Sequence, residues 1–595
     1  MRTRVGMSCG GWLAWAWWLA VGIAPGLGQP ARWMPLPPPV EATRPGFTRI
    51  DAGRAGLVFT NAVPESRHLT NQLLLDGGGV ALGDIDGDGR ADVFLTSLAG
   101  GSRLFRNLGD WRFEDRTQAS LGAVPALAGL DATGCVLADL TGDGAPELVV
   151  SSHGQGTHVL RNDGKGAFSS WATFNAGLGG HSVAVADVDG DGWLDLYVVN
   201  YRARALMDMP NARATFKVVG GKTVVDTVDG RPTTEPDLAN RFVVNARGGV
   251  EELGEPDLLL RNVGGTNWAE VTWTSGAFVD SDGTPLAAPP FDWGLSALFR
   301  DLDGNGRPEL YVCNDFQSPD RLWLNESTPG TVRLRAAPPG TLRHTSRFSM
   351  GVDAADVNRD GHDDLLVLDM LSRSHVQRLT QLEDAPPPGS ERADPMATTQ
   401  HEANTLQLGR GDSTFVEAAA FAGLQASEWS WTPAFLDVDL DGWEDVLVTT
   451  GQWRAARDLD VATALRRQRQ QRRMGDAELF AARRQYPRLE PPLVAFRNVR
   501  GRFVECAKDW GFDIARVSHG LALADLDGDG DLDVVINHLN DAPSLLRNNA
   551  AAPRIAVRLV GPDANRHGIG ARIMMASADS PLRPAAPVQE LTAGG

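Results

Sequence analysis

The sequence has few of the features that usually reveal a chemical cross-link or a reaction. It contains 4 cysteines in 595 residues, so disulfides are not expected to stabilise the fold. Cys135, Cys313 and Cys506 each lie within or beside a predicted strand, and we expect them to be small buried apolar residues. We find no phosphate-binding glycine loop, nucleophile elbow, CxxC pair or HExxH motif. Nucleotide, hydrolase, redox and zinc-protease functions therefore have no motif to support them.

Long apolar runs are also missing beyond the N-terminus. Arg2, Arg4, the apolar segment from Trp12 to Ile23 and the small residues at Gly26-Leu-Gly28 are together typical of a secretory signal peptide. An uncleaved membrane anchor is the alternative. No other stretch approaches the ~20 apolar residues that span a membrane. The sequence thus predicts a protein that is secreted, periplasmic or on the cell surface.

What the sequence does contain is one nine-residue loop, present seven times. Oxygen-bearing side chains stand at positions 1, 3, 5 and 9, and position 6 is always glycine. Such crowded oxygens repel one another unless a cation lies between them, and hard oxygen ligands at this density suit Ca²⁺. The glycine supplies the left-handed backbone of a sharp bend. The predicted ligands are Asp84, Asp86, Asp88 and Asp92 in loop 1; Asp139, Thr141, Asp143 and Glu147 in loop 2; Asp187, Asp189, Asp191 and Asp195 in loop 3; Asp301, Asp303, Asn305 and Glu309 in loop 4; Asp356, Asn358, Asp360 and Asp364 in loop 5; Asp437, Asp439, Asp441 and Asp445 in loop 6; and Asp525, Asp527, Asp529 and Asp533 in loop 7.

A polar hairpin turn rich in Asp and Gly is the alternative for any single loop, but not for seven with the same ligand spacing. An EF-hand needs its last ligand at position 12 and a helix on each side, whereas apolar β-formers flank these loops. We expect up to seven structural Ca²⁺ ions, bound least tightly where Thr141, Asn305 and Asn358 replace a carboxylate. Much of the formal charge of -19 is then a set of metal ligands.

The segments around the loops predict a four-stranded unit. Each loop joins two short apolar strands, a third strand often ends in Arg-Asn, and a fourth usually contains Phe or Trp. The seventh unit lacks a fourth strand, and Phe47–Ile50 at the other end of the chain has the right character to replace it. This predicts an all-β fold, a closed seven-bladed β-propeller, because an open solenoid would not account for the displaced strand. The other fourth strands are expected at Arg112–Arg116, Ala167–Ser170, Trp268–Val271, Thr331–Leu334, Thr414–Glu417 and Arg502–Glu505.

The spacing of the loops predicts where the unit is interrupted. We expect insertions at 202–257, at 371–403 as a loop, and at 452–490 with a helical stretch from Asp458 to Gln485. This last insertion is rich in arginine, which suggests anion binding, but acidic residues interleave and aromatic stacking platforms are absent. We therefore interpret it as a solvated helix packed on the propeller edge, with no role in nucleic-acid binding. The resulting domains are a signal peptide (1–28), a linker (29–46), the propeller (47–549) and a C-terminal β segment (550–595).

These motifs resemble a known family. The strand, D-x-D-G-D-G-x-x-D, strand pattern with its following L-x-R-N and F-x-[DE] pairs resembles the VCBS/FG-GAP-type repeats of integrin-like seven-bladed propellers. The tail, Arg554–Val560 followed by Asn565–Ala571, resembles the start of the ASPIC/UnbV module of the cartilage acidic protein family. The resemblance assigns the metal-ligand role to the loop residues named above and implies a partial module at 550–595.

The leading functional hypothesis is an exported, calcium-binding scaffold for adhesion to a protein or glycan, without enzymatic activity. The alternative is an extracellular polysaccharide lyase or hydrolase that uses the propeller channel. Its candidate residues have polar or aromatic side chains near strand starts, and we interpret them as core or channel packing. They are His153, His181, His344, His519, Trp293, Trp429 and Trp431.

Overall fold

The computed structural model describes residues 36, 44–245, 248–381, 398–561, 564–573, 576–577, 580–584 and 589–590. The predicted signal peptide and most of the predicted linker lie outside these residues. None of the helices described is both long and apolar enough to cross a membrane.

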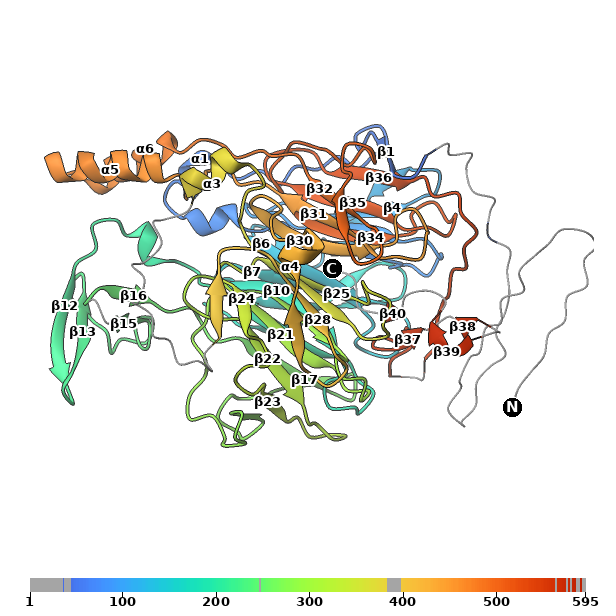
Figure 1. The fold of residues 1–595 in the computed structure, drawn as a ribbon, viewed down its shortest axis with the longest axis horizontal. Coiled ribbons are helices and arrows are strands. Elements are labelled where there is room, and N and C mark those ends of the chain that lie inside the picture. The colour runs from blue at the N-terminus through green and yellow to red at the C-terminus, as the bar shows by residue number, and fades with distance from the viewer. Residues whose placement is uncertain are drawn as a thin grey trace, which may run out of the picture.

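Seven separate sheets, each built around four antiparallel strands, form the body of the protein (Figure 1). We number the sheets by their nine-residue loops. Their strands are β2 (Val80–Gly83), β3 (Asp92–Leu95), β4 (Arg103–Asn107) and β5 (Phe113–Asp115) in sheet 1; β6 (Ala132–Ala138), β7 (Glu147–Ser152), β8 (Thr157–Asn162) and β9 (Phe168–Phe174) in sheet 2; β10 (Gly180–Ala186), β11 (Asp195–Asn200), β17 (Leu258–Val263) and β18 (Asn267–Glu270) in sheet 3; β20 (Gly294–Arg300), β21 (Glu309–Asn314), β22 (Arg321–Asn325) and β23 (Leu334–Ala336) in sheet 4; β25 (Gly351–Ala355), β26 (Asp364–Leu368), β28 (Thr405–Gly409) and β29 (Phe415–Glu417) in sheet 5; β30 (Ser430–Leu436), β31 (Asp445–Thr450), β32 (Val494–Asn498) and β33 (Phe503–Glu505) in sheet 6; and β34 (Ser518–Ala524), β35 (Asp533–His538) and β36 (Ser544–Asn548) in sheet 7.

The fourth strand of sheet 7 comes from the N-terminal end of the described chain, as the sequence predicts. β1 (Phe47–Ile50) pairs antiparallel with β36, with Phe47 opposite Asn548 and Ile50 opposite Leu545. In all seven sheets the nine-residue loop joins the first two strands, and the residue at position 9 begins the second strand. The predicted strand, loop, strand unit is therefore confirmed.

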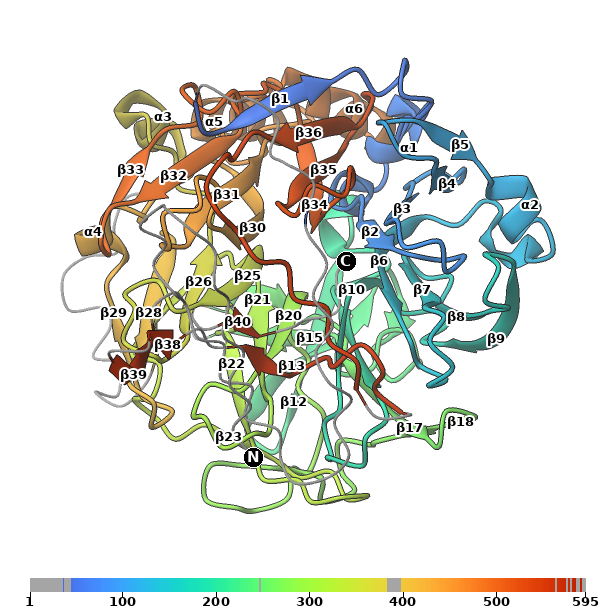
Figure 2. The same cartoon turned by 90° about the vertical axis from the view of Figure 1, so that its right-hand side faces the viewer.

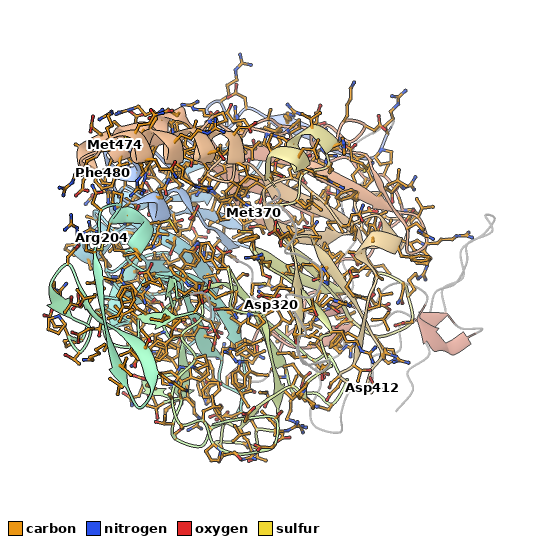
Figure 3. All side chains as sticks on the ribbon, turned by 60° about the vertical axis from the view of Figure 1, so that its left-hand side comes forward. Arg204, Asp320, Met370, Asp412, Met474 and Phe480 are labelled. Atoms are coloured by element: carbon orange, nitrogen blue, oxygen red, sulfur yellow. The ribbon has the colours of Figure 1, made fainter. Side chains whose placement is uncertain are left out.

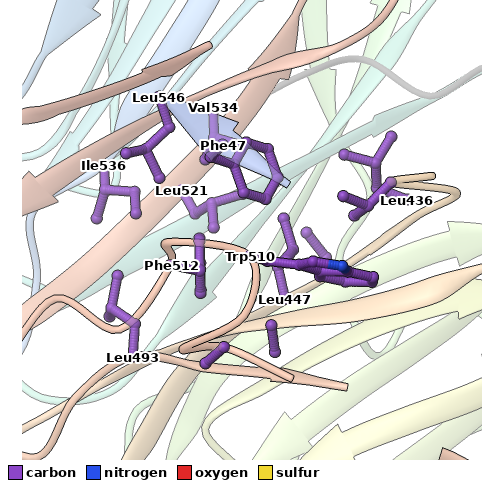
Figure 4. Packing of buried hydrophobic residues seen from close by; sticks show 14 of the residues in the cluster. Phe47, Leu436, Leu447, Leu493, Trp510, Phe512, Leu521, Val534, Ile536 and Leu546 are labelled. Atoms are coloured by element: carbon purple, nitrogen blue, oxygen red, sulfur yellow. The ribbon is translucent and has the colours of Figure 1, made fainter. Parts of the chain in front are cut away.

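The sheets are arranged in a ring. Each first strand contacts the first strands of both neighbouring sheets, and β34 contacts β2 (Figure 2). A buried apolar cluster fills each junction between neighbours; Phe512, Leu493 and Val534 lie in the one between sheets 6 and 7 (Figure 4). Corresponding clusters lie at the other six junctions. The core is thus distributed between sheets, which is a propeller-like arrangement.

One predicted strand is wrong. Thr331–Leu334 was expected as the fourth strand of sheet 4, but β23 begins at Leu334. Residues 326–333 instead form a turn, in which Thr328 and Thr331 exchange backbone hydrogen bonds of 3.0 and 2.7 Å. Sheet 4 also gains a short parallel strand, β19 (Phe278–Val279), beyond β23.

The insertions all follow the second strand of their sheet, in sheets 3, 5 and 6. The first carries η3 (Leu206–Asp208) and the short strands β12 (Ala214–Val219), β13 (Lys222–Val228), β14 (Arg231–Pro232), β15 (Phe242–Val244) and β16 (Val250–Glu252). The second was expected as a loop but contains α3 (His375–Gln381) and β27 (Thr399–His401), which pairs with β24 (His344–Ser346). The third was expected as one helical stretch and is divided into α5 (Leu459–Gln471), α6 (Asp476–Ala482) and η4 (Arg483–Gln485), because the backbone is extended at Arg472 and Gly475.

Strand direction places the insertions and the loops on opposite faces. In an antiparallel sheet the link from the first to the second strand and the link from the second to the third lie at opposite ends. Figure 1 shows α5, α6, β12 and β13 on one side and β37 to β40 on the other. The remaining short elements are α1 (Glu65–His68), η1 (Gln72–Leu75), α2 (Thr117–Leu121), η2 (Pro125–Leu127), α4 (Ala419–Ala422), β37 (Arg572–Ile573), β38 (Ala576–Ser577), β39 (Ser580–Pro584) and β40 (Gln589–Glu590).

Candidate metal-binding loops

The backbone of every loop closes around the side chain at position 1. The position-6 glycine has a φ between 81° and 94° in all seven loops, in the left-handed region that the sequence predicts. Its N–H donates to the position-1 carboxylate at 2.7 to 3.0 Å in each case. The bend therefore turns the position-1 carboxylate towards the centre of the loop.

The carboxylate at position 9 ties the loop to its own sheet. One oxygen accepts from the N–H at position 2, at 2.8 to 3.1 Å. The other accepts from an N–H near the end of the third strand, at 2.7 to 3.4 Å. These hydrogen bonds hold the position-9 side chain from two directions without a bound ion.

Five loops bring three carboxylates together. In loops 1, 3, 4, 6 and 7, ligand oxygens from positions 1, 3 and 9 lie within 4.8 Å of one another. Loops 2 and 5 have Thr141 and Asn358 at position 3, so they lack the third carboxylate of such a group. Several of the gathered oxygens are buried without a hydrogen-bond partner, namely Oδ1 of Asp86, Asp187, Asp301 and Asp439. Orphaned anionic oxygens of this kind fit a bound cation.

The electrostatics of the loops agree with this fit. Burial, assisted by the neighbouring carboxylates, raises the pKa of Asp92 and Glu147 to about 7, of Glu309, Asp364 and Asp445 to about 8, and of Asp533 to about 9. The pKa of Asp195 is also well above its ordinary value for the same reason. Holding such groups ionised at neutral pH requires a compensating positive charge, which a divalent cation supplies.

In five sheets, an asparagine at the end of the third strand joins the loop to the preceding one. The side-chain N–H₂ of Asn262 donates to the Leu194 carbonyl of loop 3 at 3.2 Å and to the Leu140 carbonyl of loop 2 at 2.8 Å. The pattern recurs at Asn107, Asn162, Asn325 and Asn498. The sequence shows the Arg-Asn pair that ends the third strand, but not the partners of the asparagine in a neighbouring sheet.

Position 4 also has left-handed backbone, which the sequence analysis missed. Five loops have glycine there, and Arg359 (φ 60°) and Leu440 (φ 53°) adopt the same conformation in loops 5 and 6. Glycine in the other five copies was the signal that could have revealed it. A non-glycine residue at such a φ costs about 1 to 2 kcal/mol.

The candidate catalytic residues of the channel do not form one reactive group. His344 lies apart from the channel and contacts His401, with 2.8 Å between Nδ1 and Nε2. His153 Nε2 lies 3.0 Å from the Leu73 carbonyl, and His181 Nδ1 lies 2.9 Å from the Leu295 carbonyl. Burial lowers the pKa of His153 and His181 to about 4 and that of His519 to about 3, so these imidazoles are neutral at pH 7.

The tryptophans of this group lie in an apolar cluster at the face that bears the insertions. Trp293, Trp429 and Trp431 are buried there with Tyr201 and Phe348. The Trp431 indole N–H donates to the Gly451 carbonyl at 2.7 Å, and that of Trp293 donates to the Glu252 carbonyl at 3.0 Å. His181, Trp431 and His519 also line a cavity of about 640 Å³ along the ring axis, whose walls are mainly the inner strands.

A family model for the FG-GAP-like repeat matches residues 84–150, 139–198 and 301–367. The chain contains FG-GAP-like repeats. The matched ranges include loops 1 to 5 and all or most of the strand that follows each of them, whereas β2 and β20, which precede loops 1 and 4, lie just outside.

The sequence is also similar to cartilage acidic protein 1 from three vertebrates. Identity is 23% over 311 residues with the *Xenopus tropicalis* protein (47% of this chain and 46% of that one), 24% over 367 residues with the *Mus musculus* protein (56% and 53%) and 24% over 334 residues with the *Homo sapiens* protein (51% and 47%). The chain thus spans about half the length of these relatives. Among solved structures, an exotype rhamnogalacturonan lyase, YesX, aligns over 80% of this chain and 72% of its own, with 13% identity and a TM-score of 0.33. The resemblance to FG-GAP repeats and to cartilage acidic protein, first seen in the motifs, is confirmed.

Proposed function

We propose that the chain is an exported, seven-bladed β-propeller that binds up to seven structural Ca²⁺ ions and holds a macromolecular partner on the face that carries the insertions. The observation behind this proposal is the repeated loop, which gathers three carboxylates in five of the seven sheets, while the opposite face carries irregular, exposed structure. The residues at positions 1, 3, 5 and 9 of the FG-GAP-like repeats would hold the ion. Calcium there would neutralise buried carboxylates and stiffen the links between first and second strands.

The hairpin insertion supports a protein as the partner. β12 is the edge strand of its small sheet, and Phe216, Val218 and Val219 are 48%, 72% and 55% exposed. An unpaired strand edge with exposed apolar side chains is a template for an added strand from another protein. Figure 3 shows this side of the molecule, with Met474 and Phe480 on the helical insertion and Arg204 before the hairpin.

The helical insertion contacts the hairpin insertion through side chains. Asn211, just before β12, donates to the Met474 carbonyl at 3.1 Å and to Asp476 at 2.6 Å. Arg483 is buried and contacts Asp208 at 2.8 Å. The two insertions therefore form one continuous projection. A glycan remains the second candidate partner, and the enzymatic hypothesis is less favoured because His153 and His181 are neutral and each contacts a backbone carbonyl.

Calcium dependence is tested by thermal unfolding with Ca²⁺, with Mg²⁺ and with EGTA. A site saturated at 100 times its Kd adds about 2.7 kcal/mol to the free energy of unfolding, so several sites should raise the Tm strongly with Ca²⁺ alone. An unchanged Tm after chelation would contradict the calcium assignment.

The binding role is tested separately, by capture of proteins and glycans from the native surroundings with the calcium-loaded full chain. A variant whose residues 214–228 are replaced by a Gly-Ser linker is the comparison. Loss of one defined protein partner in this variant is expected. Equal capture by both chains would exclude the hairpin, and capture of glycan alone would favour the second candidate.

A further inference from the structure

An arginine precedes the asparagine at the end of the third strand in five sheets, and in three of them it contacts the loop. In loop 1, the Nε atom of Arg106 lies 2.5 Å from Asp86 at position 3, and its Nη2 atom lies 3.0 Å from Asp88 at position 5. Arg90 adds a second contact to Asp88 at 2.5 Å. The guanidinium group therefore spans two predicted metal ligands of its own sheet.

The same contact recurs in loops 3 and 6. Arg261 forms an ion pair with Asp189 and lies 2.8 Å from Asp191. Arg497 Nη2 lies 2.6 Å from Asp439 and 2.9 Å from Asp441. Three independent copies of the repeat thus place one positive charge against positions 3 and 5.

In loop 7, an arginine from another part of the chain contacts the ligand at position 5. Its own third-strand arginine, Arg547, donates to Asn549 at 3.2 Å. Arg554 of the C-terminal segment lies instead 2.9 Å from Asp529 at position 5 and 3.8 Å from Asp531. The Arg554 side chain is only 7% exposed, so the charge is held in place.

In loops 2, 4 and 5 one ligand position is uncharged, and the third-strand side chain next to the loop forms no ion pair with it. Loop 2 has Thr141, and Arg161 lies instead 3.3 Å from the Gly265 carbonyl and 4.2 Å from the centre of the Trp171 ring. Loop 4 has Asn305 and loop 5 has Asn358, and the third strand there carries a leucine, Leu324 or Leu408, in place of arginine. An arginine from the third strand or from the C-terminal segment therefore contacts a ligand carboxylate wherever all four ligand positions are acidic, and the third strand supplies no such contact where one of them is uncharged.

We propose that these arginines level the charge of the seven calcium sites: in each loop with four acidic ligands, at least one guanidinium group offsets the additional carboxylate. This inference rests on the proposed calcium binding. Under this proposal, loops 2, 4 and 5 are no longer expected to bind Ca²⁺ least tightly, because a guanidinium group offsets the additional carboxylate of the other loops. An arginine next to the site opposes Ca²⁺ by charge repulsion, but it relieves repulsion between carboxylates when the ion is absent.

Loop 3 offers a direct test because Trp193 stands at its position 7 and can sensitise the luminescence of bound Tb³⁺. The part of the emission that is lost in a Trp193→Phe variant comes from Tb³⁺ in this loop. Its decrease as Ca²⁺ displaces Tb³⁺ gives the calcium affinity. Arg261→Gln should bind Ca²⁺ about tenfold more tightly in loop 3. The same variant should unfold at lower denaturant concentration in EGTA. A purely structural arginine would not strengthen calcium binding when removed.

Two variants serve as controls. Arg261→Lys keeps the charge and should bind Ca²⁺ within about twofold of the unmodified chain. Arg161→Gln removes the corresponding arginine of sheet 2, which contacts no carboxylate, and should leave the loop 3 affinity unchanged. If Arg261→Gln binds Ca²⁺ equally or more weakly while the unmodified chain binds it, charge levelling is wrong and the proposed function stands. If no loop of the unmodified chain binds Ca²⁺, both are wrong.

Discussion

Replacing Asn262 by alanine should be among the most destabilising single changes at the loop face. The side chain is fully buried and makes three hydrogen bonds: it donates to the carbonyls of Leu140 and Leu194, and it accepts from the Gly265 N–H at 3.0 Å. Alanine leaves these three buried backbone groups unpaired, at about 1 to 3 kcal/mol each. Because local relaxation recovers part of this, we expect a loss of about 3 to 5 kcal/mol in the free energy of unfolding.

The chain contains a matched control for this change. Asn548 occupies the same place in sheet 7, but its side-chain N–H₂ has no hydrogen-bond partner, and its Oδ1 accepts from the Ala550 N–H at 3.1 Å. Asn548→Ala should therefore cost only about 1 kcal/mol. Both variants are compared by urea unfolding at saturating Ca²⁺. Equal losses for the two variants would refute the argument that the bridge between sheets carries the energy.

Two further changes follow from the backbone and from buried charge. Leu440→Gly in loop 6 should raise stability by about 0.5 to 1 kcal/mol, because it removes the left-handed strain of leucine at the cost of glycine's greater chain entropy; a lower Tm in Ca²⁺ would contradict this. His519 has a folded pKa of about 3, below its unfolded value, so its contribution is present above pH 6.5 and lost as pH falls. His519→Gln should therefore lose less stability than the unmodified chain between pH 6 and pH 4, by up to about 1.4 kcal/mol per pH unit, and parallel stability curves would count against it.

The loops were predictable because their chemistry is local. Carboxylate spacing, the glycine at position 6 and the apolar residues on both sides all lie within a short window, and they determine the strand, loop, strand unit together. The displaced strand β1 was predictable for a different reason: a repeat that lacks one strand must find it elsewhere. The start of β23 was predicted three residues too early, because the Thr-Val-Arg-Leu sequence at 331–334 has strand character. Its first three residues belong instead to the turn at 326–333.

Contacts between sheets were not predictable from one sequence. The Arg-Asn pair that ends the third strand was visible as a pattern, yet nothing in the pattern says that Asn262 contacts loop 2 or that Arg261 contacts Asp189. The correlation between an arginine and a fourth carboxylate could have been found by comparing the seven copies. The structure of the insertions had no repeat to compare with, so their short strands and the break between α5 and α6 appear only in the fold.

The ring of asparagine bridges is interrupted at two junctions, and other contacts join the sheets there. Sheet 5 has Gly409 in place of asparagine, and at its junction with sheet 4 the buried Arg300 lies 2.7 Å from Asp363 of loop 5. At the junction of sheets 6 and 7, where the Asn548 amide is unpartnered, Arg49 on β1 lies 2.8 Å from Asp513, in the chain that follows sheet 6. Both substitutes are ion pairs, but the first is buried and the second is half exposed. Because water screens exposed pairs far more than buried ones, the junction closed by the N-terminal strand is the more weakly tied of the two by these contacts.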